Sequence, residues 1–121
     1  MKKILIVDDE PNIIMSLEYT FKKNNYEVFI ARDGQEALDI LKFNIPDIII
    51  LDIMMPMVDG YATLKQIKSN KKLTNTKVIF LSAKNKATDI EKGISLGADA
   101  YLIKPFSIKN IVDKVFELVS I

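Results

Sequence analysis

The stretch Ile48-Ile49-Ile50-Leu51-Asp52 decides how this chain folds. Four consecutive large aliphatic residues are typical of a strand buried on both faces, and such strands belong to parallel sheets. Other apolar runs also end in polar residues: Ile4–Val7 before Asp8 and Asp9, Val78–Leu81 before Ser82, and Tyr101–Ile103 before Lys104. Ligands of open α/β sheets bind beyond the carboxyl ends of the strands. The pattern therefore predicts that three carboxylates, a hydroxyl and an ammonium converge on one edge of a sheet.

Strand and helix patterns alternate five times along the chain. The expected strands are Lys3–Val7, Tyr26–Ala31, Asp47–Leu51, Lys77–Leu81 and Ala100–Ile103. Two helices are expected at Pro11–Asn24 and at Thr88–Leu96, the second ending before Gly97. Three more are expected to begin near Asp33 and Glu36, after the loop Asp52–Gly60, and at Ser107, which caps the last one. The segment Asn70–Thr76 is expected to be a polar connection. Five βα units imply a right-handed, doubly wound α/β sheet with helices on both faces. The more polar second and fifth strands favour the edges, which gives the order 2-1-3-4-5 of a flavodoxin-like (βα)5 domain over residues 1–121.

Composition narrows the class of protein. The 121 residues suffice for one core, and the 49% hydrophobic and 27% charged residues are those of an ordinary globular domain. The net charge is +1, so no basic excess favours nucleic acid or a membrane surface as the main partner. The sequence has no Cys and no His, which excludes disulfides, thiolate metal sites and imidazole chemistry. Any histidine chemistry must therefore come from a partner.

The N-terminal sequence and the apolar runs bear on location. Met1-Lys2-Lys3 resembles the charged end of a signal peptide, but the apolar run behind it ends at Asp8, short of the roughly 7–15 residues required. Asp47, Asp52 and Asp59 interrupt the longest run, well short of the roughly 18 apolar residues of a membrane span. We expect a cytoplasmic protein with no membrane partner.

The converging residues suit phosphoryl chemistry. If the first and third strands are neighbours, Asp8 and Asp9 lie beside Asp52, and like charges a few ångströms apart repel by about 4 kcal/mol at a dielectric of 20. A proton or a cation must relieve this repulsion, and hard oxygen ligands suit Mg²⁺. Lys104, expected on the opposite side, can neutralise a phosphoryl group, and Ser82 can donate to its oxygens. Asp52 is the best candidate nucleophile because it is single and ends the most apolar strand, mid-sheet.

Four sequence elements resemble the response-regulator receiver domain of two-component signalling. They are Asp8-Asp9-Glu10, then Asp52-Ile53-Met54-Met55-Pro56 with Asp59-Gly60, then Ser82-Ala83, and last Lys104-Pro105-Phe106. Each element alone is weak. Their shared order, over essentially the whole chain, makes the resemblance specific.

The resemblance implies a role for each site residue. Asp52 would accept a phosphoryl group from a phosphohistidine on a sensor histidine kinase or a histidine phosphotransfer protein. Asp9, Asp52 and the backbone carbonyl of Met54 would hold Mg²⁺, with Asp8 contacting it through water. The phosphoryl oxygens would contact Lys104, Ser82 and the amide of Ala83, and the Lys104–Pro105 peptide would be cis.

The resemblance also implies an output. Phosphorylation would draw Ser82 inward, Tyr101 would rotate, and the face of the fourth helix, fifth strand and fifth helix would change its affinity for an effector protein or domain. The chain would catalyse only its own phosphorylation and dephosphorylation, and this domain would bind no nucleic acid. The sequence departs from the family pattern in small ways. Ser82 stands where Thr is frequent, and either supplies the hydroxyl; Ala100 replaces an Asp usual in regulators that dimerise through the fourth-helix face, which argues against that dimer mode. Met54 and Lys84 occupy positions that tune the phosphoryl lifetime in the family.

Two other functions and a scaffold role are alternatives. A haloacid-dehalogenase-type phosphohydrolase also uses an Asp nucleophile, but it needs Asp-x-Asp, and Met54 stands at the second position. A flavin binder needs a phosphate loop after the first strand, where Asp8-Asp9-Glu10 would repel phosphate. A scaffold with the same fold and no phosphorylation is the third alternative.

Ordinary structural roles compete with each functional one. Asp8 or Asp9 can cap a helix, Asp52 and Ser82 can be turn residues, and Lys104 can be a solvated lysine. Tyr101 is an edge-strand aromatic or a switch, and the methionines at positions 54, 55 and 57 can fill core and loop. A solvated helix face explains one basic stretch better than nucleic-acid contact does: Lys65, Lys68, Lys71 and Lys72.

Overall fold

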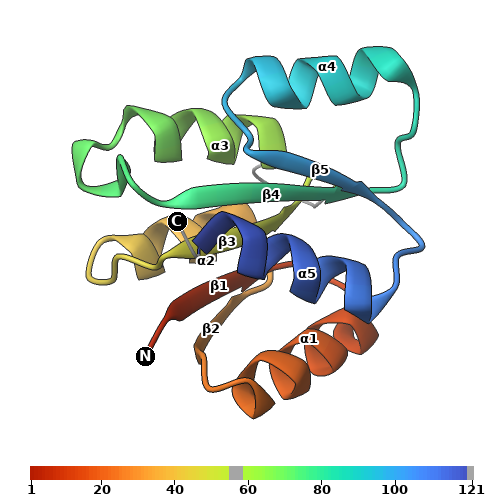
Figure 1. Cartoon of the computed structure of the whole chain (residues 1–121). Coiled ribbons are helices and arrows are strands. Elements are labelled where there is room, and N and C mark those ends of the chain that lie inside the picture. The colour runs from red at the N-terminus through yellow and green to blue at the C-terminus, as the bar shows by residue number, and fades with distance from the viewer. Residues whose placement is uncertain (55–58, 120–121) are drawn as a thin grey trace.

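The computed structural model describes residues 1–54 and 59–119 as alternating strands and helices (Figure 1). The strands are β1 (Lys3–Val7), β2 (Glu27–Ala31), β3 (Ile48–Asp52), β4 (Lys77–Ser82) and β5 (Ala100–Ile103). The helices are α1 (Pro11–Lys23), α2 (Gly34–Leu41), α3 (Gly60–Ser69), the 3-10 helix η1 (Lys71–Leu73), α4 (Ala87–Ser95) and α5 (Ile108–Val119). No helix within the described ranges is long and apolar enough to cross a membrane.

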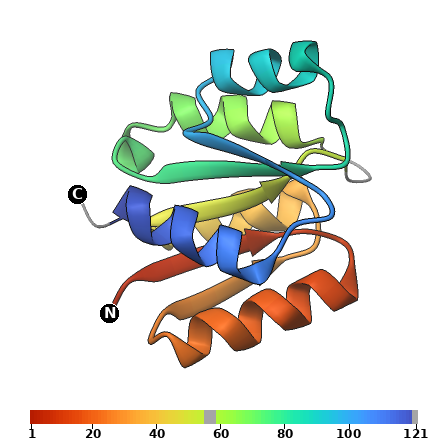
Figure 2. The same ribbon diagram turned by 45° about the vertical axis from the view of Figure 1, so that its right-hand side comes forward.

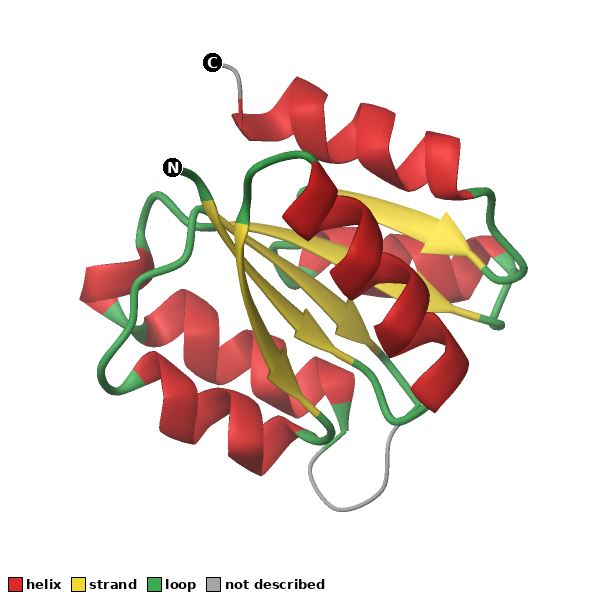
Figure 3. Ribbon diagram, turned by 90° about the horizontal axis from the view of Figure 1, so that it is seen from below, coloured by secondary structure: helices red, strands yellow, loops and turns green. Residues whose placement is uncertain are grey.

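The strands form one parallel sheet in the order β2-β1-β3-β4-β5, as the sequence predicts. Figure 3 shows the sheet between two layers of helices. Alternate residues of β3 enter different cores: Ile49 and Leu51 pack with residues of α2 and α3, whereas Ile48 and Ile50 pack with residues of α1 and α5. Both faces of β3 are covered, which explains its unbroken apolar run.

Local signals in the sequence account for the helix ends. The side chain of Asp33 accepts a hydrogen bond from the Glu36 N–H at 2.8 Å, and that of Ser107 accepts one from the Asn110 N–H at 3.0 Å. Gly97, directly after the C-cap of α4, has φ of 112°, a conformation that favours glycine. These predicted helix boundaries are confirmed.

One predicted connection is partly helical. The segment Asn70–Thr76 contains η1, because the Asn70 side chain accepts a hydrogen bond from the Lys72 N–H at 3.0 Å and Leu73 is buried. The other predicted bounds agree with the observed ones to within one residue, and β1 and β5 match at both ends. Asp52 is the last residue of β3 rather than the first of the loop.

The strand ends place the predicted site. Because the sheet is parallel, the arrowheads of all strands point to the same side of the molecule (Figure 2). The polar residues that end or follow β1, β3, β4 and β5 therefore lie along one edge.

Candidate functional site

Buried acidic residues gather at the carboxyl ends of β1 and β3. Asp8 is 0% exposed and Asp52 is 2% exposed, whereas Asp9 is open to solvent. One carboxylate oxygen from each of the three lies within 4.8 Å of the others. Buried carboxylates are rare unless they are paired or bind a cation, so this cluster requires compensating charge.

The ammonium of Lys104 supplies part of that charge. Its Nζ lies 3.2 Å from Oδ2 of Asp8, 3.3 Å from Oδ2 of Asp52 and 3.1 Å from Oε1 of Glu10. The sequence placed Lys104 opposite the carboxylates, but in the structure it lies among them. The physical reason is electrostatic, since an ammonium just beyond β5 is attracted to two carboxylates that burial has stripped of water.

Burial and charge shift the pKa values of these groups. Burial first, and then the charge of Asp8, raise the pKa of Asp52 from 3.8 to about 6, although Lys104 and the Met54 N–H lower it. Burial likewise raises the pKa of Asp8. Burial lowers the pKa of Lys104, but attraction to Asp8 and Asp52 and the hydrogen bond to Glu10 raise it more, so the net shift is upward. Shifted carboxyl groups at the end of a parallel sheet are typical of functional sites.

Backbone groups fix the two buried carboxylates. Oδ1 of Asp8 accepts a hydrogen bond from the Glu10 N–H at 2.9 Å, and Oδ1 of Asp52 accepts one from the Met54 N–H at 3.2 Å. Oδ2 of Asp8 is buried and, among the described residues, accepts no well-directed hydrogen bond despite its contact with Lys104. A buried oxygen with spare acceptor capacity, next to two other carboxylates, suits a hard cation such as Mg²⁺.

The loop after β4 links Ser82 to Tyr101. Ser82 is fully buried, and its Oγ accepts a hydrogen bond from the Lys84 N–H at 3.0 Å. The Lys84 carbonyl in turn accepts a hydrogen bond from the hydroxyl of half-buried Tyr101 at 2.9 Å. Exposed Ala83 lies between these residues and lines a surface cavity of about 560 Å³ with Glu10 and Lys104. The arrangement connects the edge strand β5 to the site through a single loop.

Two residues of the quoted motifs have contacts that the sequence did not assign. Glu10 holds Lys104, and Gly60 closes the loop after β3 by donating its N–H to the Ile53 carbonyl at 3.0 Å. A Cβ on Gly60 would lie 2.6 Å from the Asp52 carbonyl oxygen, so only glycine fits there. The sequence signals that could have pointed to these two residues are the acidic residue that follows Asp8-Asp9, which is Glu10, and the glycine that follows Asp59, which is Gly60. Met55, Pro56 and Met57 lie outside the described residues.

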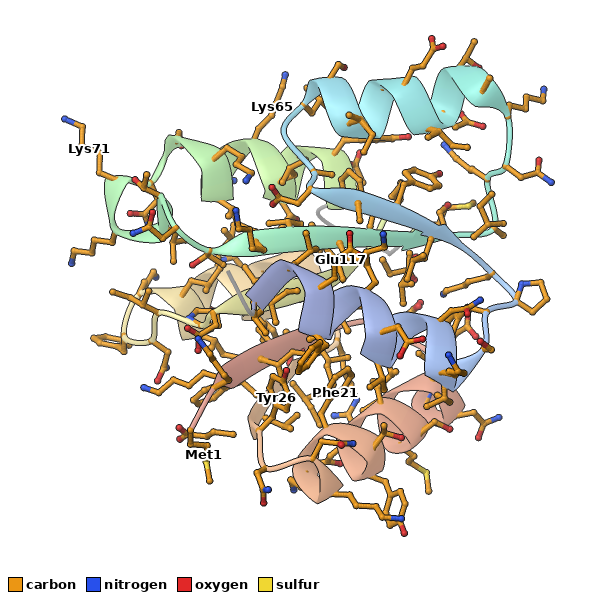
Figure 4. The ribbon with its side chains drawn as sticks, in the orientation of Figure 1. Met1, Phe21, Tyr26, Lys65, Lys71 and Glu117 are labelled. Atoms are coloured by element: carbon orange, nitrogen blue, oxygen red, sulfur yellow. The ribbon has the colours of Figure 1, made fainter. Side chains whose placement is uncertain are left out.

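The Lys104–Pro105 peptide and the basic stretch can also be compared with the sequence predictions. The Lys104–Pro105 peptide is cis, as the resemblance implied. In the basic stretch, Lys65 and Lys71 extend away from the body of the molecule (Figure 4), and Lys68 pairs with Asp99 at 3.6 Å. These positions agree with a solvated helix face.

Similarity to known proteins covers most of the chain. Residues 4–116 match the family described as "Response regulator receiver domain". The alkaline phosphatase synthesis transcriptional regulatory protein PhoP of Bacillus subtilis (strain 168) is 40% identical over 114 residues, which are 94% of this chain and 47% of PhoP. The chain thus spans about half the length of this curated relative.

Solved structures of receiver domains superpose closely on this one. The receiver domain of Francisella response regulator 1452 has a TM-score of 0.91 at 36% identity, with 99% of this chain and 98% of that chain covered. Response regulator TrrA from Thermotoga maritima, solved in complex with Mg(2+)-BeF, has a TM-score of 0.84 at 35% identity, with 98% and 99% covered. The fold, the acidic cluster and these matches agree, and the chain belongs to the response regulator receiver domains of two-component systems.

Proposed function

We propose that this domain is a phosphorylation-activated switch in which Asp52 accepts a phosphoryl group from a phosphohistidine of a sensor histidine kinase or a histidine phosphotransfer protein. The observation that carries the proposal is the buried Asp52 carboxylate, 3.3 Å from the Lys104 ammonium and beside Asp8. A phosphoryl transfer needs positioning and charge neutralisation more than acid–base help. A fixed carboxylate next to an ammonium meets both needs.

The chain's own residues position the group. The Met54 N–H orients Asp52 through Oδ1, which leaves Oδ2, beside Lys104, as the oxygen for the phosphoryl group. Lys104 then neutralises phosphoryl oxygens, and the Ser82 hydroxyl and the Ala83 amide donate to them. Burial of Asp52 and Ser82 excludes water from this side of the acceptor.

Mg²⁺ fits the acidic cluster. Asp8, Asp9, Asp52 and the Met54 carbonyl are the groups that would hold it, and hard oxygen donors of this kind suit the ion. When bound, Mg²⁺ supplies positive charge that lowers repulsion between the carboxylates and the phosphoryl oxygens.

Mg²⁺ is expected to stabilise the folded chain, because it binds a cluster that the unfolded chain does not form. At ten times its dissociation constant, it should raise the free energy of unfolding by about 1.4 kcal/mol. Thermal unfolding in Mg²⁺ and in chelator measures the effect. Asp9→Asn should lose most of this gain, whereas Asp113→Asn, on α5, should keep it. An equal gain in Asp9→Asn would contradict the assignment of Asp9 as a ligand.

We further propose that Lys104 transmits phosphorylation to the face formed by α4, β5 and α5, which binds an effector protein or domain. The Lys104 N–H donates to the Ser82 carbonyl at 2.8 Å, and hydrogen bonds continue from Ser82 through Lys84 to Tyr101, which supports this route. Movement of Ser82 toward a phosphoryl group would release the loop and let Tyr101 rotate.

Lys104→Ala is therefore expected to separate phosphorylation from its response. NMR spectra of the native chain should show amide shifts at Tyr101 and along α5 after labelling. The variant should still accept the label, more slowly, without those shifts. Lys109→Ala removes another lysine, which pairs with Asp113, and should respond like the native chain. Native-like shifts in Lys104→Ala would count against the proposed route.

The proposal keeps the single domain over residues 1–121 and the cytoplasmic location that the sequence predicts, with no turnover of a separate substrate. Its test is the intact mass of the chain after incubation with a small acyl phosphate, in Mg²⁺ and in chelator. One phosphoryl adduct that depends on Mg²⁺ is the expected result. Continued turnover of phosphate esters would favour a hydrolase, and no adduct under any condition would favour a scaffold.

A further inference from the structure

Glu10 lies at the mouth of the site and has no part in the proposed function so far. Its backbone N–H donates to buried Asp8, which fixes the position of the residue. Its side chain is 57% exposed and accepts a hydrogen bond from Nζ of Lys104 at 3.1 Å. A fixed backbone and an outward carboxylate place a negative charge over the lysine that the proposed function assigns to the phosphoryl group.

Glu10 competes with a phosphoryl group for this ammonium. Lys104 has three carboxylate partners, of which Asp8 and Asp52 are buried within the site. The Nζ atom donates hydrogen bonds to Glu10 and Asp52 and lies against Asp8, so phosphoryl oxygens must compete with these carboxylates for the ammonium. Glu10 is the solvent-exposed partner of the three, and its contact with Lys104 draws Nζ toward solvent.

Glu10 also faces an approach to the site. The cavity of about 560 Å³ beside the site is lined by Glu10, Ala83 and Lys104, together with residues of α1 and α5. A small anion in this cavity is exposed to both Glu10 and Lys104, because both residues line it. Like charges repel, and the effect grows with the charge of the incoming group.

We propose that Glu10 is a specificity-determining residue that slows phosphorylation of Asp52 by small anionic phosphodonors. It does so by holding the Lys104 ammonium and by repelling the donor. This inference rests on the proposed function.

Two donors of different charge separate this effect from a general change in reactivity. With acetyl phosphate, a dianion, a bond forms between an Asp52 carboxylate oxygen and phosphorus as the bond to acetate breaks, and acetate leaves with the electron pair. With phosphoramidate, a monoanion whose nitrogen is already protonated, the phosphorus–nitrogen bond breaks and ammonia leaves. Neither transfer needs a further reactant, so the donor charge is the main electrostatic difference.

The test is the rate of adduct formation by the full chain in Mg²⁺ at low ionic strength. Glu10→Gln should be labelled by acetyl phosphate roughly threefold to tenfold faster than the native chain, with a smaller gain for phosphoramidate. Glu10→Asp keeps the charge and should be slower than Glu10→Gln. Glu117→Gln is the matched control, because Glu117, labelled on α5 in Figure 4, is 66% exposed and pairs with Lys114 at 3.2 Å. It should keep the native rate.

A readout without donor or metal tests the contact itself. The NMR resonance of the Lys104 ammonium should shift in Glu10→Gln and stay in place in Glu117→Gln. A native labelling rate in Glu10→Gln, or an unmoved Lys104 resonance, would overturn the role of Glu10. If the native chain takes no label from either donor, the proposed function fails instead, and the proposal for Glu10 fails with it.

Discussion

Asp52→Asn is expected to abolish phosphoryl uptake from an acyl phosphate and to make the fold more stable. Uptake ends because an amide oxygen is a far weaker nucleophile than a carboxylate oxygen. Stability increases because the change removes a buried charge that lies beside Asp8. With the folded pKa at about 6 and the unfolded value at 3.8, the gain near pH 7.5 is on the order of 2–3 kcal/mol in metal-free buffer.

The sign of this gain sets its pH dependence. The folded pKa of Asp52 is raised, so the folded chain binds the proton more tightly than the unfolded chain. Ionisation of Asp52 therefore costs stability, and this cost grows as the pH rises from about 4 to about 6. The difference between Asp52→Asn and the native chain should be near zero below pH 4 and constant above pH 6 to 7. Urea unfolding at several pH values measures it.

Asp59→Asn is the control for both effects. Asp59 is exposed and caps α3 through the Ala62 N–H at 2.9 Å, a bond that asparagine can also accept. This variant should take up the label and unfold like the native chain. Full uptake by Asp52→Asn, or equal stability of Asp52→Asn and the native chain at pH 7.5, would contradict the environment described for Asp52.

Gly60→Ala is expected to destabilise the domain and to slow phosphoryl uptake. The new Cβ would lie 2.6 Å from both the Asp52 carbonyl oxygen and the Cα of Ile53, which are backbone atoms that cannot turn aside. The end of β3 must therefore shift, at a cost of about 1–3 kcal/mol. Because Asp52 is part of this backbone, its carboxylate moves relative to Lys104, and a displacement of about 1 Å can lower a rate roughly 100-fold.

Gly97→Ala is the control that separates a loss of stability from a slower phosphoryl uptake. Gly97 has φ of 112°, so alanine is strained there, but the residue ends α4 and contacts Lys68 rather than the site. This variant should lose stability while its folded molecules are labelled at the native rate. Denaturant unfolding and labelling time courses compare the two variants. Native stability and a native labelling rate in Gly60→Ala would show that the loop after β3 does not constrain Asp52.

The sequence predicts the fold well because its signals are local. An apolar run such as Ile48–Leu51 indicates a covered strand by itself, and Asp33 or Gly97 marks a helix end by its own chemistry. Parallel topology then places every strand end at one edge, which brings Asp8 and Asp52 together with no knowledge of distances.

Side-chain contacts across the site depend on packing that no local pattern encodes. Lys104 and Glu10 lie 94 positions apart in the chain, and their hydrogen bond depends on how far each side chain reaches across the edge of the sheet. The sequence shows Gly60 as part of a motif, but the need for glycine at this position comes from its close approach to the backbone of Asp52. The pKa of Asp52 likewise depends on burial and on neighbours from other strands.

Chemical trapping of the aspartyl phosphate shows which residue carries the phosphoryl group. Borohydride reduces an acyl phosphate of aspartate to homoserine, and tandem mass spectrometry of the digested chain then locates the altered residue. We expect homoserine at Asp52 alone, in samples treated with acyl phosphate and Mg²⁺. Homoserine at Asp8 or Asp9, with Asp52 unaltered, would contradict it.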